Sequence, residues 1–234
     1  MNYKLKVLGI ETSNITGGVA FLKDTKLLKE SHFTRGMVHG RLLIPAIEKG
    51  LKQLRWKLNQ IDLIAVDIGP GSYTGLRVGV TAAKTISYAI KQQYPKSRVG
   101  LVGVVSLDAM VENIPTKYEY VCPIIDARWN QVYTALYKKA KEGYKQVSPP
   151  RASLPTDLIK ELPKEVFIFG DGLSRYKEVF NRNDIISGEE RFWYPQPRHI
   201  ARLGLKLFKA GIKTDPFRLN PLYLRPTEAE LKNQ

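Results

Sequence analysis

The chain has 234 residues, of which 43% are hydrophobic, so it can bury a substantial core in one large or two small domains. No run of about 18 apolar residues occurs, and a strand-like pattern begins at once, which predicts a cytoplasmic protein without a membrane span. The single cysteine, Cys122, excludes an intramolecular disulfide and a cysteine-cluster zinc site. The formal net charge of +15 fits RNA, an acidic protein surface, or a lysine-rich solvated surface.

The first hundred residues have the pattern of an antiparallel meander followed by alternating helices and strands. Strands are expected over residues 5–10, 18–23, 26–33, 63–68 and 99–105, and helices over 38–56 and 74–92. Pro45 lies inside the first helical pattern, so we expect it to kink that helix or to mark its start near Leu43.

The second half repeats this order in a weaker form. A short helix capped by Ser106 is expected first. It is followed by strands over residues 120–126, 132–138, 144–147 and 166–169, and by helices over 156–162, 174–180 and 199–211. The segment 7–24 is similar in pattern to 122–139, and 63–71 to 166–172.

This weak repeat predicts a duplicated α/β protein with a cleft between two lobes. We expect an N-terminal lobe over residues 1–104 and a C-terminal lobe over 105–234. The helix over 199–211 is a candidate to pack back onto the N-terminal lobe.

The segment from Asp67 to Arg77 combines a buried strand, a glycine turn and a helix start. The free N–H groups and partial positive charge of a helix N-terminus suit an anion. The alternative is a tight strand-to-helix turn without a ligand. Neither a Walker A loop nor a GxGxxG fingerprint is present. The candidate nucleotide- or phosphate-binding residues are Glu11, Thr12, Ser13, Gly71, Ser72 and Arg77.

Other catalytic chemistries find little support. None of the three histidines stands at ligand spacing from another, so no metal site is expected, and a serine nucleophile elbow is missing. Carboxylates for magnesium-dependent phosphoryl transfer are available at Glu11, Asp67, Asp126 and Asp171. An ATPase or small-molecule kinase therefore stays open as an alternative function.

The string Gly-Pro-Gly-Ser-Tyr-Thr-Gly-Leu-Arg at residues 69–77 closely resembles the signature of the TsaB (YeaZ) family. Supporting similarities lie, in order, at residues 11–13, 39–45, 126–128, 132–133, 221–225 and 228–230. Gly40 and Arg41 depart from the family pattern.

The resemblance implies an actin/Hsp70-like two-lobed fold, each lobe a mixed sheet with flanking helices. It also implies a non-catalytic subunit, without catalytic residues of its own. Such a subunit dimerises with itself or with a TsaD-type catalytic subunit and acts with a TsaE-type P-loop ATPase. The complex transfers a threonylcarbamoyl group to the N6 amine of the adenosine next to the anticodon in tRNAs. No cofactor is expected, although ATP or ADP at a subunit interface is compatible with this assignment.

Small residues on the helix after the glycine turn allow another helix or backbone to approach closely. On the resemblance we predict that this helix and the preceding one form the dimer surface. The alternative is packing against the sheet of the same lobe. The predicted interface residues are His39, Leu43, Ile47, Leu51, Gly75, Leu76, Gly79, Val80 and Ala83.

Overall fold

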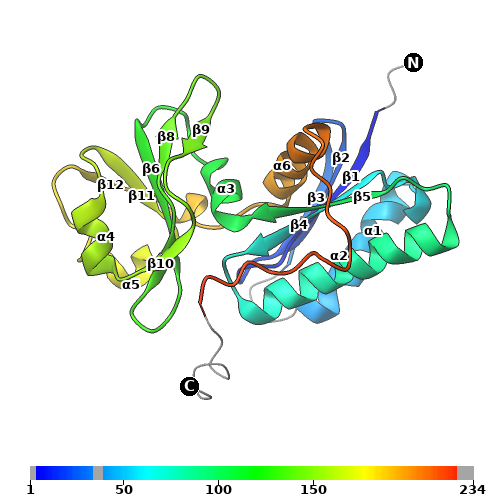
Figure 1. Cartoon of the computed structure of the whole chain (residues 1–234), viewed down its shortest axis with the longest axis horizontal. Helices are drawn as coiled ribbons and strands as arrows, with labels where there is room; N and C mark the ends of the chain where they lie inside the picture. The colour runs from blue at the N-terminus through cyan, green and yellow to red at the C-terminus, as the bar shows by residue number, and fades with distance from the viewer. Residues whose placement is uncertain (1–3, 34–38, 226–234) are drawn as a thin grey trace. The chain divides into compact units, whose positions relative to one another are not determined.

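The computed structural model describes residues 4–33 and 39–225, which form two compact units (Figure 1). Unit 1 comprises the described residues up to Ala109 together with Pro195–Pro221. Unit 2 comprises Met110–Tyr194 and the described residues after Pro221. Within this described part of the chain, every helix is too short or too polar to cross a membrane.

The sheet of unit 1 begins as the predicted meander. Its strands are β1 (Lys6–Glu11), β2 (Gly18–Lys23), β3 (Lys26–His32), β4 (Leu63–Gly69) and β5 (Gly100–Val105). Their order is β3-β2-β1-β4-β5, with β2 antiparallel to both neighbours and with β1, β4 and β5 parallel. Five of six residues in β1 and six of seven in β4 are buried, as expected for strands covered on both faces.

Helices cover both faces of this sheet because successive side chains of a strand point to opposite sides. Leu8 and Ile64 pack with α1 (His39–Leu54) and α2 (Tyr73–Gln93), whereas Val7 and Leu63 pack with α6 (Pro197–Lys209). Other helical segments are η1 (Leu58–Gln60), which was not predicted, and α3 (Ser106–Val111), whose first four residues belong to unit 1. Helix α1 continues through Pro45, so the proline does not mark its start.

Unit 2 repeats the same strand order. Its sheet runs β10-β7-β6-β11-β12, with β6, β11 and β12 parallel and with β7 antiparallel to both neighbours. The strands are β6 (Tyr120–Asp126), β7 (Val132–Thr134), β10 (Arg151–Ser153), β11 (Val166–Phe169) and β12 (Ile185–Ser187). The weak sequence repeat therefore corresponds to a repeated sheet topology. The glycine turns after β4 and β11 both have positive φ, 104° at Gly69 and 123° at Gly170.

Some predicted elements of unit 2 differ from those observed. The strand expected over 132–138 is divided into β7 and β8 (Tyr137–Lys139), because the two pieces pair with different parts of β6. β8 also pairs with β9 (Tyr144–Gln146). The short helical segments are α4 (Pro155–Glu161), α5 (Leu173–Tyr176) and η2 (Glu190–Phe192). Helix α5 ends four residues earlier than the pattern suggested.

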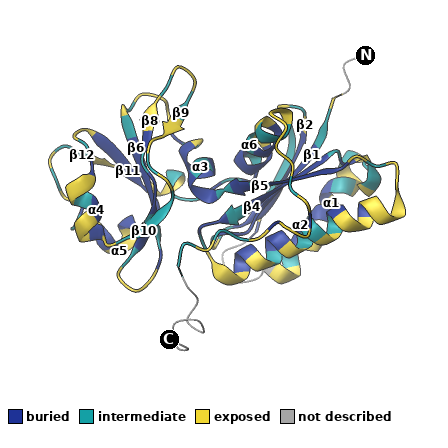
Figure 2. Ribbon diagram, viewed as in Figure 1, coloured by how far each residue is buried: buried dark blue, intermediate teal, exposed yellow. Residues whose placement is uncertain are grey.

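The fold class is the expected α/β class, with two mixed sheets and flanking helices. Residues 105–109 lie in unit 1, beyond the predicted boundary, and α6, the helix named as a candidate to pack there, is also part of unit 1. The apolar face of α6 explains its place: Ala201 and Leu205 are buried against Val7, Leu63 and Val102. Figure 2 shows the strands at the centre of each sheet largely buried and exposed stripes along α1 and α2.

Candidate functional site

Polar side chains gather at the carboxyl edge of the parallel strands in unit 1, where α/β sheets commonly place ligands. Glu11 ends β1, Asp67 lies near the end of β4, and Ser106 follows β5. Both carboxylates are fully buried. Glu11 Oε1 accepts hydrogen bonds from the backbone N–H of Ser13 at 2.6 Å and from its hydroxyl at 2.7 Å.

Asp67 is held in a similar way. Its Oδ1 accepts hydrogen bonds from the N–H of Gly69 at 2.7 Å and from the Ser106 hydroxyl at 2.6 Å. The Ser106 side chain was predicted to cap the helix that begins there. In the structure Ser106 is the first residue of α3, and its hydroxyl donates to a carboxylate 39 residues away in the sequence.

Burial shifts the protonation of this pair. Loss of hydration, reinforced by the charge of Asp67, raises the pKa of Glu11. Loss of hydration also raises the pKa of Asp67, although hydrogen bonds from Ser106 and Gly69 oppose the shift. Two buried carboxylates that repel each other favour a state with one bound proton at neutral pH.

The N-terminus of α2 lies directly against the segment that follows β1. The N–H of Ser72 donates to the carbonyl of Ser13 at 2.7 Å, and the Ser72 hydroxyl caps the helix by accepting from the N–H of Gly75 at 3.2 Å. A Cβ on Gly71 would lie 2.4 Å from the same Ser13 carbonyl. The N-terminus is therefore packed against the chain's own backbone.

Five of the six predicted phosphate-site residues come together at this edge: Glu11, Thr12, Ser13, Gly71 and Ser72. Arg77 does not join them in any described contact, since it is exposed and its guanidinium lies 4.5 Å from the centre of the Tyr73 ring. Among the residues that the structure describes, no group of three or more histidine, cysteine, aspartate or glutamate side chains could hold a metal ion.

The predicted interface residues on α2 lie inside unit 1. Gly75, Leu76, Gly79, Val80 and Ala83 are all buried. A Cβ on Gly75 would lie 2.0 Å from the Thr12 carbonyl, and one on Gly79 would lie 2.2 Å from the Thr12 hydroxyl. The prediction that this small-residue face meets a partner is therefore wrong, because close packing on the sheet of the same unit uses it.

The first helix shows the same arrangement. Leu43 and Ile47 are buried and Leu51 is half-buried, and all three contribute to the core beneath α1. His39 begins α1, but its side chain lies outside the described part of the structure.

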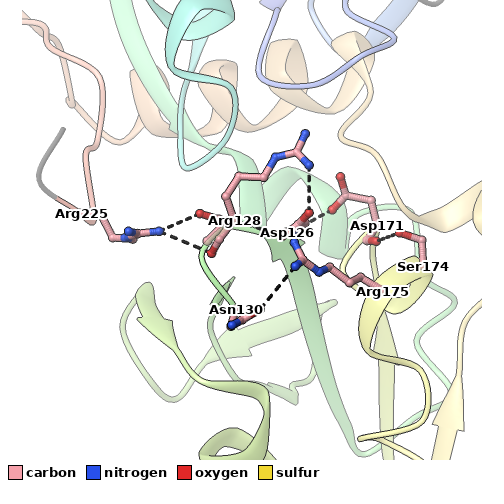
Figure 3. Close-up of polar contacts among 8 residues, drawn as sticks. Asp126, Arg128, Asn130, Asp171, Ser174, Arg175 and Arg225 are labelled. Atoms are coloured by element: carbon pink, nitrogen blue, oxygen red, sulfur yellow. Dashed lines mark hydrogen bonds and ion pairs between the residues drawn. The ribbon is translucent and has the colours of Figure 1, made fainter. Parts of the chain in front are cut away.

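The equivalent edge of unit 2 has a different character. Asp126 ends β6 and Asp171 follows β11, and the N–H of Asp126 donates to Asp171 Oδ1 at 3.0 Å (Figure 3). Asp126 Oδ1 accepts from the N–H of Arg128 at 2.9 Å, and an ion pair of 3.5 Å joins the two side chains. Burial raises the pKa of Asp171 to about 6.

The loop after β6 is exposed and carries cations. Arg128, Trp129 and Asn130 all have left-handed backbones, with φ of 60°, 50° and 58°. Arg175 donates to the Asn130 side-chain oxygen at 3.3 Å, and Arg225 donates to the Ala127 carbonyl at 2.9 Å (Figure 3). Sequence reasoning identified the two aspartates but missed these contacts, because Arg175 and Arg225 lie in distant segments whose spacing gives no signal.

Comparisons with known proteins agree with one another. A family model described as "TsaD: tRNA N6-adenosine threonylcarbamoyltransferase" matches residues 36–231. The tRNA threonylcarbamoyladenosine biosynthesis protein TsaB of Bacillus subtilis strain 168 is 31% identical over 97% of this chain and 97% of its own length. The protein of that name from Escherichia coli K12 is 24% identical over 94% of this chain and 95% of its own.

A solved structure shares the fold. YeaZ from Pseudomonas aeruginosa aligns with a TM-score of 0.81 at 20% identity, covering 94% of this chain and 100% of its own. The matched family model and the Bacillus relative show the family of the chain from its sequence. The Pseudomonas structure shows that the fold is the same. The chain belongs to the TsaB (YeaZ) family.

Proposed function

We propose that this chain is a non-catalytic subunit of the cytoplasmic complex that makes threonylcarbamoyladenosine in tRNA. In this complex a TsaD-type partner transfers the threonylcarbamoyl group to the N6 amine of the adenosine next to the anticodon. Support comes from the relatives in Bacillus subtilis and Escherichia coli, which are named for threonylcarbamoyladenosine biosynthesis. The matched family model carries the name of the transferase itself.

The buried acid pair of unit 1 is the observation that carries the non-catalytic assignment. A general acid, a general base or a magnesium ligand has to reach the reacting groups. Glu11 and Asp67 are fully buried, and one oxygen of each accepts two hydrogen bonds from the chain's own groups. Their arrangement favours a structural role at the sheet edge over phosphoryl transfer.

The proposed partners are a TsaD-type subunit, a TsaE-type P-loop ATPase and, for the isolated chain, a second copy. Since the small-residue face of α2 is internal, we assign the partner surface to the outer faces of α1 and α2. Ile44, Tyr73 and Tyr88 lie there with exposed fractions of 43%, 40% and 45%. ATP or ADP would then bind at a subunit boundary, and tRNA would be brought through the complex.

Reconstitution tests this function. The chain should co-purify with TsaD- and TsaE-type proteins, and the three together should form the modified nucleoside in tRNA, measured by mass spectrometry of the digest. The chain alone with magnesium and ATP should show no substantial turnover. Substantial hydrolysis by the isolated chain would overturn the non-catalytic assignment and favour the ATPase or kinase alternative.

A matched pair of variants tests the partner surface. Ile44→Arg should weaken association with the TsaD-type subunit about 10-fold, because it places a charge in an interface that excludes water. Ile212→Arg is the control, since Ile212 is similarly exposed, at 49%, but follows α6. Equal association of both variants on a sizing column would place the interface elsewhere.

A further inference from the structure

We propose that the open edge of unit 2 binds an unpaired segment of RNA directly, through the surface formed by Arg128, Trp129, Asn130 and Arg175. In this arrangement an unstacked base lies on the Trp129 indole, and the arginines face the phosphates. The inference goes beyond the proposed function, which brings tRNA to the complex and not to this chain. Binding is measured on the isolated chain, so its failure is distinguishable from failure of the complex to assemble.

Trp129 has features that folding does not account for. Its side chain is 66% exposed, so it contributes little to the core. Its backbone has φ of 50°, a left-handed conformation that costs roughly 1–2 kcal/mol for a residue with a Cβ. A large exposed aromatic on such a backbone suits a stacking partner, because base stacking on aromatic side chains is a main mode of single-strand binding.

The loop that carries Trp129 is held in place on both sides. The N–H of Ala127 donates to the carbonyl of Gln131 at 3.0 Å, and the N–H of Gln131 donates back to the carbonyl of Arg128 at 3.0 Å. Arg225 fixes the start of the loop through the Ala127 carbonyl, and Arg175 fixes its far end through Asn130 (Figure 3). A loop ordered before binding loses little conformational entropy when it binds.

The charges around the loop are sorted by exposure. The Arg128 side chain is 80% exposed and Arg175 is exposed, whereas the Asp126 side chain is only 16% exposed and Asp171 is largely buried. Arg128 and Arg175 therefore face solvent while Asp126 and Asp171 are turned inward, although Asp126 pairs with Arg128. Guanidinium groups beside an exposed ring match the alternating phosphates and bases of a single strand.

Arg175 also lines a hollow of unit 2. It has a volume of about 490 Å³, within the range of small-ligand pockets. The residues that line it include Ser174, Arg175, Lys177, Glu178, Glu189 and Trp193. The Trp193 indole N–H donates to the Gly188 carbonyl at 2.9 Å, which fixes the orientation of the ring. Here a second ring, hydroxyls and carboxylates offer partners for a base and its exocyclic amine.

These features favour a single strand over a duplex or an acidic peptide. Stacking on Trp129 requires an unstacked base, which a duplex does not present. An acidic peptide would use the arginines but would leave the exposed Trp129 ring without a planar partner. The fluorescence anisotropy of a labelled RNA of about 12 nucleotides, matched to single-strand site sizes, measures the interaction.

Trp129→Ala should weaken binding of this RNA about 10-fold, while Trp129→Phe should recover part of the loss. Phe217→Ala is the matched control, because Phe217 is a 75% exposed aromatic residue of unit 1, and it should bind as the parent does.

Arg128→Ala and Arg175→Ala should each reduce the slope of log K against log salt by about 0.7. Lys52→Ala, which removes an exposed cation on α1, should change that slope less.

Three results would overturn the proposal: Trp129→Ala binding as tightly as the parent, the annealed duplex binding as tightly as the single strand, or polyglutamate displacing the RNA at equal charge concentration. The last two would indicate a purely electrostatic surface without a stacking site.

Discussion

Unit 1 and unit 2 share one strand order, yet Thr12 and Ser13 after β1 are buried, whereas residues 128–130 after β6 are exposed. The helices that follow the glycine turns differ in length, since α2 has 21 residues and α5 has four. The long helix packs its first turns onto Thr12 and Ser13, whereas the short one leaves residues 128–130 uncovered.

The chemistry of the two edges follows from this difference. In unit 1 the acids are removed from water, and hydroxyl and N–H groups of the same chain serve as their partners. In unit 2 Asp126 keeps an exposed arginine partner, and the loop offers cations and an indole to solvent. A duplicated topology thus yields one edge that is closed by groups of the same chain and one that is open to solvent.

Among the tests of this difference between the units, filling the space between α2 and Thr12 should change the unfolding free energy most. Gly79→Ala should cost about 3 kcal/mol of unfolding free energy in unit 1, because the new Cβ would lie 2.2 Å from the buried Thr12 hydroxyl. Differential scanning calorimetry measures the loss.

Two variants make this prediction specific. Gly40→Ala is the control, because a Cβ at this exposed helical glycine meets nothing within 4 Å, so it should be neutral or slightly stabilising. Adding Thr12→Ala to Gly79→Ala should recover part of the stability. Undiminished stability of Gly79→Ala with lost partner association would restore the outward-facing assignment for this helix face.

The buried acid pair predicts a pH dependence that belongs to unit 1. Folding raises the pKa of Glu11 above its ordinary value of 4.5. The protonated Glu11 side chain therefore makes its full contribution to stability below pH 4.5. The contribution is lost as pH rises through the raised folded value, because the buried carboxyl must then ionise. At alkaline pH, Glu11→Gln should be more stable than the parent by about 2 kcal/mol, since the amide carries no charge.

Thermal unfolding from acid to alkaline buffers measures this difference. Glu48→Gln provides the control, because Glu48 is exposed on α1 and the same substitution removes a charge that is not buried. An unchanged pH dependence in Glu11→Gln would mean that folding does not raise the pKa of Glu11.

The sequence predicted the elements whose pattern is long and local. The apolar run at residues 63–68 and the alternating strands of the meander correspond to β4 and β1–β3. The three-residue strands β10 and β12 were not predicted, because so short a segment has no measurable period. The repeat in pattern was sufficient to indicate the repeated sheet order.

The site was predictable only where its residues follow the strands. Glu11 ends β1 and Asp67 lies near the end of its parallel neighbour β4, so their proximity follows from topology. The packing direction of α2 did not follow, since small residues suit a partner helix and the sheet of the same unit equally well. The contact of Arg225 with Ala127 joins residues 98 apart, and no local pattern encodes it.

The smallest effect concerns the strain in the open edge. Trp129→Gly should stabilise unit 2 by about 1 kcal/mol, because glycine adopts a φ of 50° without the steric cost of a Cβ. Trp129→Ala is its matched control, since it also removes the indole but keeps the Cβ and therefore the strain. Calorimetry should thus rank Trp129→Gly above Trp129→Ala, and neither should bind single-stranded RNA as the parent does. The opposite ranking, with both variants less stable than the parent, would show that the indole supports the fold of unit 2. In that case the contrast between a structural edge and a ligand-binding edge would no longer hold.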